Sequence, residues 1–286
     1  MVDNKAKIEN LVRNMGELPT LPSVFLTINQ MLSNPRTSAT EVGQTIANDQ
    51  VIASKVLKLV NSAFYGLPGR VNTISHAIVI LGFSSIKNIV LTTSVLSSLN
   101  LKKPIEGFSH AEFWKHSAAV GALARLVARE AKFQKQEESF VAGLLHDIGK
   151  LILAVCAPDE FAKALNFAAE KKCLFLDAEQ ELFGLNHTNI SAWVQEQWKL
   201  PADIASVLVN HHRNLAAAGG NAKLVAVVQV ADVLARGLQI GHPCDSTIPI
   251  LADEALDILG ISEQGLSNIL KLSSDELQNA LALVSE

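Results

Sequence analysis

Apolar residues recur along this chain at the spacing of an α-helix, and this pattern restricts the fold more than any other feature. The spacing i, i+3, i+4, i+7 appears near residues 8–15, 53–60 and 86–93. It places apolar side chains on one helix face, whereas the alternation typical of strands is hard to find. Apolar residues make up 49% of the chain and aromatic residues only 5%, which suits helix-on-helix packing. We therefore predict an all-α fold.

Two short motifs predict where helices begin. "SATE" (Ser38–Glu41) and "SSDE" (Ser273–Glu276) have a serine followed three residues later by a glutamate. This is the capping-box pattern, in which both side chains bond the first free N–H groups of a helix. We expect one helix to start after Ser38 and the last helix of the chain to start after Ser273.

A polar connector divides the sequence. "LNLKKPIEGFSH" (Leu99–His110) combines two lysines, a proline and a glycine, which are typical of a loop. We predict a helical N-terminal part over residues 1–108 and a longer helical part over residues 109–286. Residues 216–223 and 241–249 are predicted to be loops within the second part.

Charge and composition limit the partners. The net charge is −4, so there is no electrostatic reason to expect nucleic-acid binding, and the basic residues Lys55, Lys58, Arg70 and Lys87 are too sparse for a patch. No run approaches about 18 uninterrupted apolar residues, so we expect no membrane partner. The three cysteines lie far apart and lack a C-x-x-C pair, which favours reduced thiols and a cytoplasmic location.

Histidine and aspartate residues interrupt several apolar segments of the second part. The sequence "GLLHDIGKLIL" carries His146 and Asp147 side by side, and Asp232 lies within "VVQVADVLA". An unpaired carboxylate buried among such residues would be costly, and a shared divalent cation would remove that cost. Mixed nitrogen and oxygen donors suit Fe, Mn, Zn, Co or Ni. Seven residues are candidate ligands for it: His116, His146, Asp147, His187, His211, His212 and Asp232.

Each candidate also has a simpler interpretation, and spacing alone leaves both open. His211 and His212 could form an exposed helix end, where the helix dipole favours a positive charge. His187 could lie in a turn, and Asp232 could pair with Arg236 four residues later on the same helix.

The order His116, His146-Asp147, Asp232 resembles the HD superfamily of metal-dependent phosphohydrolases. His187 and the pair His211-His212 are similar to the extra ligands of its HD-GYP branch, which hydrolyses cyclic di-GMP. The chain lacks a Gly-Tyr-Pro tail after the pair. Most of the chain, from about residue 15 to 240, resembles the HDOD (HD-related output domain) family, through the segments "LPTLP", "IANDQVIASKVLKLVNSAFYG", "TISHAIVILGFSSIKNIVL", "FWKHS" and "HDIGK".

The resemblance implies an HD-type helical bundle over residues 109–286. It further implies one metal on His116, His146, Asp147 and Asp232, and a second on His187, His211 and His212, with Asp147 shared between them. Fe or Mn is favoured, and Zn or Ni would also fit. Asp147 and Lys150 would be the catalytic residues, Lys150 facing a phosphate.

Two functions follow from this resemblance. The first is a bacterial signalling module whose metal site is structural or sensory and whose input comes from a signalling protein partner. The second is a working phosphohydrolase or phosphodiesterase that acts on a phosphoester such as a nucleotide or cyclic dinucleotide.

Overall fold

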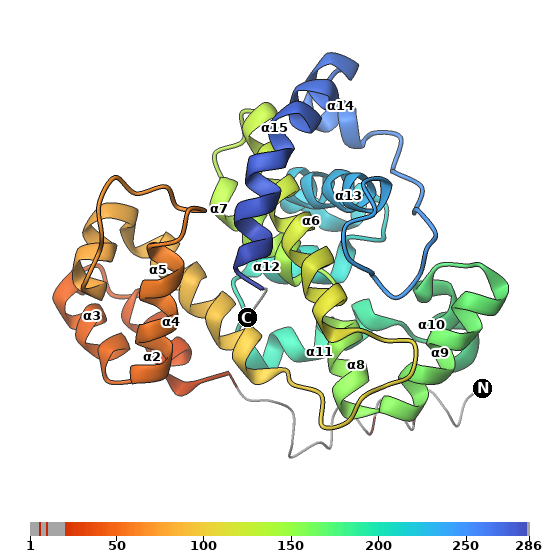
Figure 1. The fold of residues 1–286 in the computed structure, drawn as a ribbon, viewed down its shortest axis with the longest axis horizontal. Coiled ribbons are helices and arrows are strands. Elements are labelled where there is room, and N and C mark those ends of the chain that lie inside the picture. Colours follow the sequence, from red (N-terminus) through yellow and green to blue (C-terminus); the bar gives the residue numbers. More distant parts are fainter. Residues whose placement is uncertain (1–5, 7–9, 11–20, 285–286) are drawn as a thin grey trace. The chain divides into compact units, whose positions relative to one another are not determined.

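The structure is a computed structural model that describes residues 6, 10 and 21–284, and its regular elements are helices throughout that part (Figure 1). The all-α prediction is confirmed. The apolar stripe predicted near residues 8–15 lies outside the described residues.

The chain forms two compact units that divide after Asn100. The predicted boundary after residue 108 falls later in the same irregular connector, and its exact place stays a prediction. Over residues 21–100, which the structure describes, the first unit contains four α-helices, and the last of them is interrupted at Gly82, where φ is +82°. These helices are α2 (Ser23–Met31), α3 (Ala39–Ala47), α4 (Gln50–Val60) and α5 (Ile74–Ser98).

The second unit is a larger helical bundle. Its elements are α6 (His110–Glu130), α7 (Gln136–Leu145), α8 (Ile148–Cys156), α9 (Pro158–Lys171), α10 (Phe175–Phe183), α11 (His187–Trp198), α12 (Ala202–Asn210), the 3₁₀-helix η1 (Leu215–Asn221), α13 (Ala222–Gly237), α14 (Ala255–Leu259) and α15 (Glu263–Ala282). In this unit α6 packs against α7, α13 and α15 (Figure 1). The predicted loop at residues 216–223 is instead largely the 3₁₀-helix, whereas residues 241–249 are irregular as predicted.

One predicted helix start is confirmed and the other is wrong. Ser38 accepts the backbone N–H of Glu41, whose carboxylate accepts the N–H of Ser38, so the capping box exists. Ser273, by contrast, lies inside α15, which begins after the cap residue Ser262. The Ser273 hydroxyl donates to the carbonyl of Leu270, which is how a serine is accommodated in a helix interior.

Two glycines let α6 and α7 approach at backbone distance. A Cβ atom added at Gly143 would lie 2.8 Å from the Val120 carbonyl oxygen and 2.9 Å from the Gly121 Cα, and one at Gly121 would lie 2.9 Å from the Phe140 carbonyl oxygen. These are distances that real Cβ atoms do not reach. The contact fixes the end of α7, which leads directly into His146.

Within the described part of the chain, three segments are long and apolar enough to cross a membrane by length and composition alone: Ile74–Ser98, Gln136–Cys156 and Leu215–Gly237. In the second of these, 94% of the most apolar window is buried inside the protein. Its apolar character therefore serves the core of the bundle, while the absence of a membrane partner stays a prediction.

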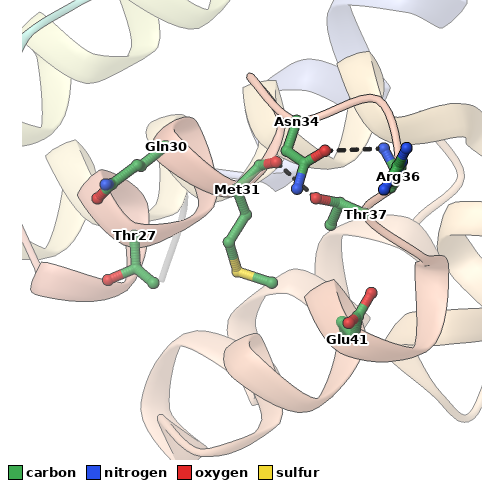
Figure 2. A pocket seen from close by; sticks show the side chains of 7 residues that line it. All are labelled: Thr27, Gln30, Met31, Asn34, Arg36, Thr37 and Glu41. Carbon is green, nitrogen blue, oxygen red and sulfur yellow. Dashed lines mark hydrogen bonds between the residues drawn. The ribbon is translucent and has the colours of Figure 1, made fainter.

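A polar pocket of about 530 Å³ lies in the first unit (Figure 2). Its wall includes a short turn in which Thr37 donates to the Met31 carbonyl and the Arg36 backbone N–H donates to Asn34. The seven lining residues are Thr27, Gln30, Met31, Asn34, Arg36, Thr37 and Glu41. None of the predicted metal ligands lines it.

Replacing Gly143 with alanine tests the close contact between α6 and α7. We expect Gly143→Ala to lower the free energy of unfolding by about 1–3 kcal/mol, because the added methyl group must push two backbones apart. Chemical denaturation followed by circular dichroism measures it.

Gly237 is the matched control, since it is an exposed helical glycine with open space around its Cα. Gly237→Ala should be neutral or stabilising by up to about 1 kcal/mol. Equal effects of the two substitutions would contradict the argument.

Candidate metal centre

His146 and Asp147 occupy the junction between α7 and α8. Helix α7 ends at Leu145 and α8 begins at Ile148, so the pair lies between two helices. The Asp147 backbone, with φ −96° and ψ +14°, leaves ideal helical geometry. Both side chains are fully buried. The break lets two adjacent residues direct their side chains into the same site, which an unbroken helix would spread about 100° apart.

The other five predicted ligands come from four further places in the second unit. His116 is in α6, His187 is the first residue of α11, and Asp232 is in α13. His211 and His212 follow the end of α12. The structure brings all seven residues together, and only His212 is partly exposed.

The ligand atoms form two adjacent groups. Within each group every donor atom lies within 4.8 Å of the others. Their members are His116, His146 and Asp232 in the first group, and Asp147, His187, His211 and His212 in the second.

Asp147 connects the two groups through its two carboxylate oxygens. Oδ1 lies 3.2 Å from His187 Nε2 and 3.4 Å from His211 Nε2, while Oδ2 lies 3.2 Å from His146 Nε2. In the first group, Asp232 Oδ1 lies 3.1 Å from His116 Nε2. Donor atoms about 2.1 Å from one ion and about 90–110° apart are separated by roughly 3.0–3.4 Å. The observed separations therefore match donors arranged around a common ion.

Backbone carbonyls set the orientation of two imidazoles. His146 Nδ1 donates to the Gly143 carbonyl at 2.7 Å, and His211 Nδ1 donates to the Val207 carbonyl at 3.1 Å. A carbonyl only accepts, so in the neutral ring the proton is on Nδ1 and the lone pair is on Nε2, facing the centre. This is the tautomer that a metal-binding histidine needs.

A buried carboxylate does the same for His187. Glu179 Oε2 accepts from His187 Nδ1 at 2.5 Å and from the His187 backbone N–H at 3.0 Å. A carboxylate in this position raises the electron density on the opposite ring nitrogen and so strengthens a metal ligand.

Several donor atoms of the centre are buried without a hydrogen-bond partner. They are Asp147 Oδ1 and the Nε2 atoms of His116, His146, His187, His211 and His212. Buried polar atoms normally have hydrogen-bond partners, so a cluster of unpartnered atoms in one place requires an explanation. A divalent cation supplies it, and the residues present therefore fit a metal.

The charges of the buried groups also favour a bound cation. Four carboxylates are buried around the centre, on Asp147, Glu179, Asp232 and Asp245, whereas the buried cations there are Lys150 and Arg236. With these groups ionised and the histidines neutral, the formal charge is −2. A cation would offset this excess.

Most of the pKa shifts favour the protonation states that bind a metal. His187 is the exception, because burial would lower its pKa but the Glu179 carboxylate raises it. Burial would raise the pKa of Asp147, but His146 and Lys150 bring it well below the usual range. Burial likewise opposes ionisation of Asp232, and Arg236 and His116 outweigh it, so its pKa is also well below the usual value. Burial lowers the pKa of His211 to about 4. At neutral pH both carboxylates are thus ionised and His211 is neutral.

Lys150 lies inside this centre. Its side chain is 1% exposed, and its ammonium donates to Asp147 Oδ2 at 2.7 Å and to the Pro243 carbonyl at 3.0 Å. Burial alone would lower the pKa of Lys150, but the neighbouring Asp147 carboxylate raises it. Its predicted contact with a phosphate stays a prediction.

Residues that the sequence did not single out complete the centre. Glu179 precedes His187 by eight residues, and no periodic signal connects them. Asp245 lies in a loop and binds Arg236. The pair Asp232–Arg236, considered above as an alternative to metal binding, also exists, with Arg236 Nε donating to Oδ1 at 2.9 Å and Oδ2 at 3.1 Å. Asp232 therefore both pairs with Arg236 and faces His116.

The fold and the site together place this chain in a class of proteins: helical bundles with a histidine–aspartate candidate metal centre. The HDOD domain family matches residues 18–214, so the chain belongs to the HDOD family.

Solved structures of similar proteins support this assignment. An HDOD domain protein of unknown function from Geobacter sulfurreducens is 26% identical, with a TM-score of 0.77 over 97% of both chains. A protein from Shewanella amazonensis SB2B, named provisionally as a metal-dependent phosphohydrolase, is 20% identical, with a TM-score of 0.67 over 99% of this chain and 100% of its own; this likeness concerns the fold.

A longer relative is also similar. An uncharacterized protein from Treponema pallidum (strain Nichols) is 24% identical over 233 residues, which are 80% of this chain. The match spans only 44% of that relative's length.

Replacing Glu179 with glutamine tests its support of His187. The amide is isosteric but neutral, so we expect Glu179→Gln to weaken metal affinity by about 10–100-fold, the usual cost of losing such a partner. Competition with a chelator of known affinity measures it.

Glu181→Gln on the exposed side of α10 is the matched control and should bind metal as the wild type does. Indistinguishable affinities in all three proteins would refute the assigned role of Glu179.

Proposed function

We propose that this chain is a bacterial, cytoplasmic signalling module of the HDOD family, and that its histidine–aspartate centre holds one or two divalent transition-metal ions in a structural or sensory role. Fe or Mn is favoured, and Zn or Ni would also suit the donor set. Its signal would come from a protein partner. The observation that carries the metal proposal is the set of buried, unpartnered Nε2 atoms around Asp147.

The two donor groups support a proposed assignment of the ligands. His116, His146 and Asp232 would hold one ion, and His187, His211 and His212 the other, with Asp147 shared. A bound divalent ion at such a site supplies Lewis acidity and an activated water molecule. The chain itself supplies the neutral imidazoles, the ionised carboxylates and the apolar surroundings that exclude bulk water.

Burial favours the structural or sensory role over turnover. Six of the seven ligand side chains are at most 4% exposed, namely those of His116, His146, Asp147, His187, His211 and Asp232. A phosphoester must reach a metal directly to be hydrolysed. In the described arrangement, only the side of the centre at His212 borders solvent.

The hydrogen bonds of Lys150 also favour a structural or sensory role over turnover. Two of its three N–H donors are used by Asp147 and the Pro243 carbonyl. A phosphate would therefore meet an ammonium group that is already largely satisfied.

A metal-dependent phosphohydrolase or phosphodiesterase, acting on a nucleotide or cyclic dinucleotide, is the second candidate. The position of Asp147 favours it, because a carboxylate that faces both donor groups could bind two adjacent ions, and two-metal sites are common in phosphoester hydrolysis. The provisional name of the Shewanella amazonensis protein agrees with this candidate.

Metal analysis tests the centre itself. Purified wild-type protein should contain about one or two Fe, Mn, Zn or Ni ions per chain by elemental mass spectrometry. The double variant His146→Ala/Asp147→Ala should lose them, because it removes donors from both groups.

His76→Ala is the control, since His76 is exposed in the first unit, and it should retain the wild-type metal content. An empty wild-type protein after supply of these metals would refute the proposal.

An activity screen separates the two candidate functions. We expect metal-loaded protein to leave phosphoesters, nucleotides and cyclic dinucleotides intact, because the centre is closed to them. Product formation would be followed by chromatography with Mn or Fe supplied. Turnover that Asp147→Ala abolishes would instead establish the hydrolase.

A further inference from the structure

The irregular segment Gly241–Thr247, here called the strap, lies against the metal centre. Pro243, Cys244 and Asp245 are buried, whereas His242 and Ser246 are exposed. The strap thus connects the protein surface to the interior next to the candidate ligands.

Each of the two carboxylate ligands forms an ion pair with a basic side chain three or four residues later in the sequence. Lys150 lies 2.7 Å from Asp147 Oδ2, and Arg236 Nε lies 2.9 Å from Asp232 Oδ1. All four side chains are buried. Buried pairs of this kind are strongly affected when one partner changes.

The strap binds both of these cations. Lys150 Nζ donates to the Pro243 carbonyl at 3.0 Å. Arg236 donates from one terminal nitrogen to Asp245 Oδ1 at 2.7 Å and to the Thr247 carbonyl at 3.0 Å. The strap therefore reaches both carboxylate ligands through one intermediate residue each.

The strap is itself held at two further points. Asp245 Oδ2 accepts the backbone N–H of Phe175 at 3.0 Å, and the His242 N–H donates to the Glu112 carbonyl at 3.0 Å. At Gly241, where φ is +67°, an added Cβ would lie 2.2 Å from the backbone nitrogen of His116. Only glycine fits so close to the helix turn that carries this ligand.

Arg236 is shared between two carboxylates. Its terminal nitrogen binds Asp245, and its contact with Asp232 is through Nε. Without the charge of Asp245, the guanidinium has one carboxylate partner left, and a charge-assisted pair with Asp232 strengthens. A more tightly paired Asp232 is a poorer ligand for a cation.

We propose that Asp245 is a positioning residue for the metal centre, acting through Arg236 on Asp232, and that the strap sets the placement of both carboxylate ligands. The inference rests on the proposed metal site. It assigns a role to a loop that supplies no ligand itself.

The variant Asp245→Asn tests this role in the full chain, because asparagine keeps the shape and can still accept the Phe175 N–H. We expect its affinity for Mn²⁺, measured by chelator competition, to fall at least about tenfold. The ligand-field absorption of the Co²⁺-loaded variant should also differ from that of the wild type, which a loss of stability alone would not cause.

Asp253→Asn is the matched control, as Asp253 is exposed further along the same connection, and it should match the wild type in both measurements. Wild-type affinity and an unchanged Co²⁺ spectrum for Asp245→Asn would overturn the inference while leaving the metal proposal intact. A wild-type protein that binds neither Mn²⁺ nor Co²⁺ would overturn both.

If Asp245→Asn fails to fold, Asp245→Glu replaces it, because it keeps the charge and displaces the carboxylate by one methylene group. Its Co²⁺ spectrum should be altered, with a smaller loss of affinity. An unchanged spectrum in this variant would again overturn the inference.

Discussion

The Asp147 carboxylate is the group on which the arrangement of the second unit depends. It is fully buried at a helix junction, where an isolated charge would be very unfavourable. Lys150 binds one oxygen, and imidazoles from His146, His187 and His211 approach the two oxygens from three other positions in the chain. The helices that carry these groups must therefore meet at one point, whatever else the core requires.

Glycines make that meeting possible. A Cβ atom at Gly149 would lie 2.1 Å from the His187 carbonyl oxygen, so α8 and α11 touch through their backbones beside the centre. Gly143 and Gly121 likewise let the backbones of α7 and α6 touch. The ligands are consequently placed by close backbone contacts between the helices that carry them.

Much of this could be predicted from the sequence, for physical reasons. Helical periodicity predicted the fold class. The histidines and aspartates that interrupt apolar segments, together with their resemblance to the HD and HD-GYP ligand order, predicted all seven ligand candidates. The supporting shell could not be found in the same way. Glu179 and Asp245 reach the centre only because the chain folds back on itself, and neither has a local pattern. The pattern at Ser273 predicted a helix start that does not exist, since a serine can bond within a helix as readily as it can cap one.

The partial exposure of His212 has a consequence for the speed of metal exchange. Its ring contacts those of His187 and His211, with centroids 5.2 Å and 4.1 Å away, so it stands between solvent and the buried donors. An ion would enter or leave past this one side chain, while the other ligands require the bundle to open. The residence time of a bound metal would then follow the motion of a single imidazole rather than the strength of the whole donor set.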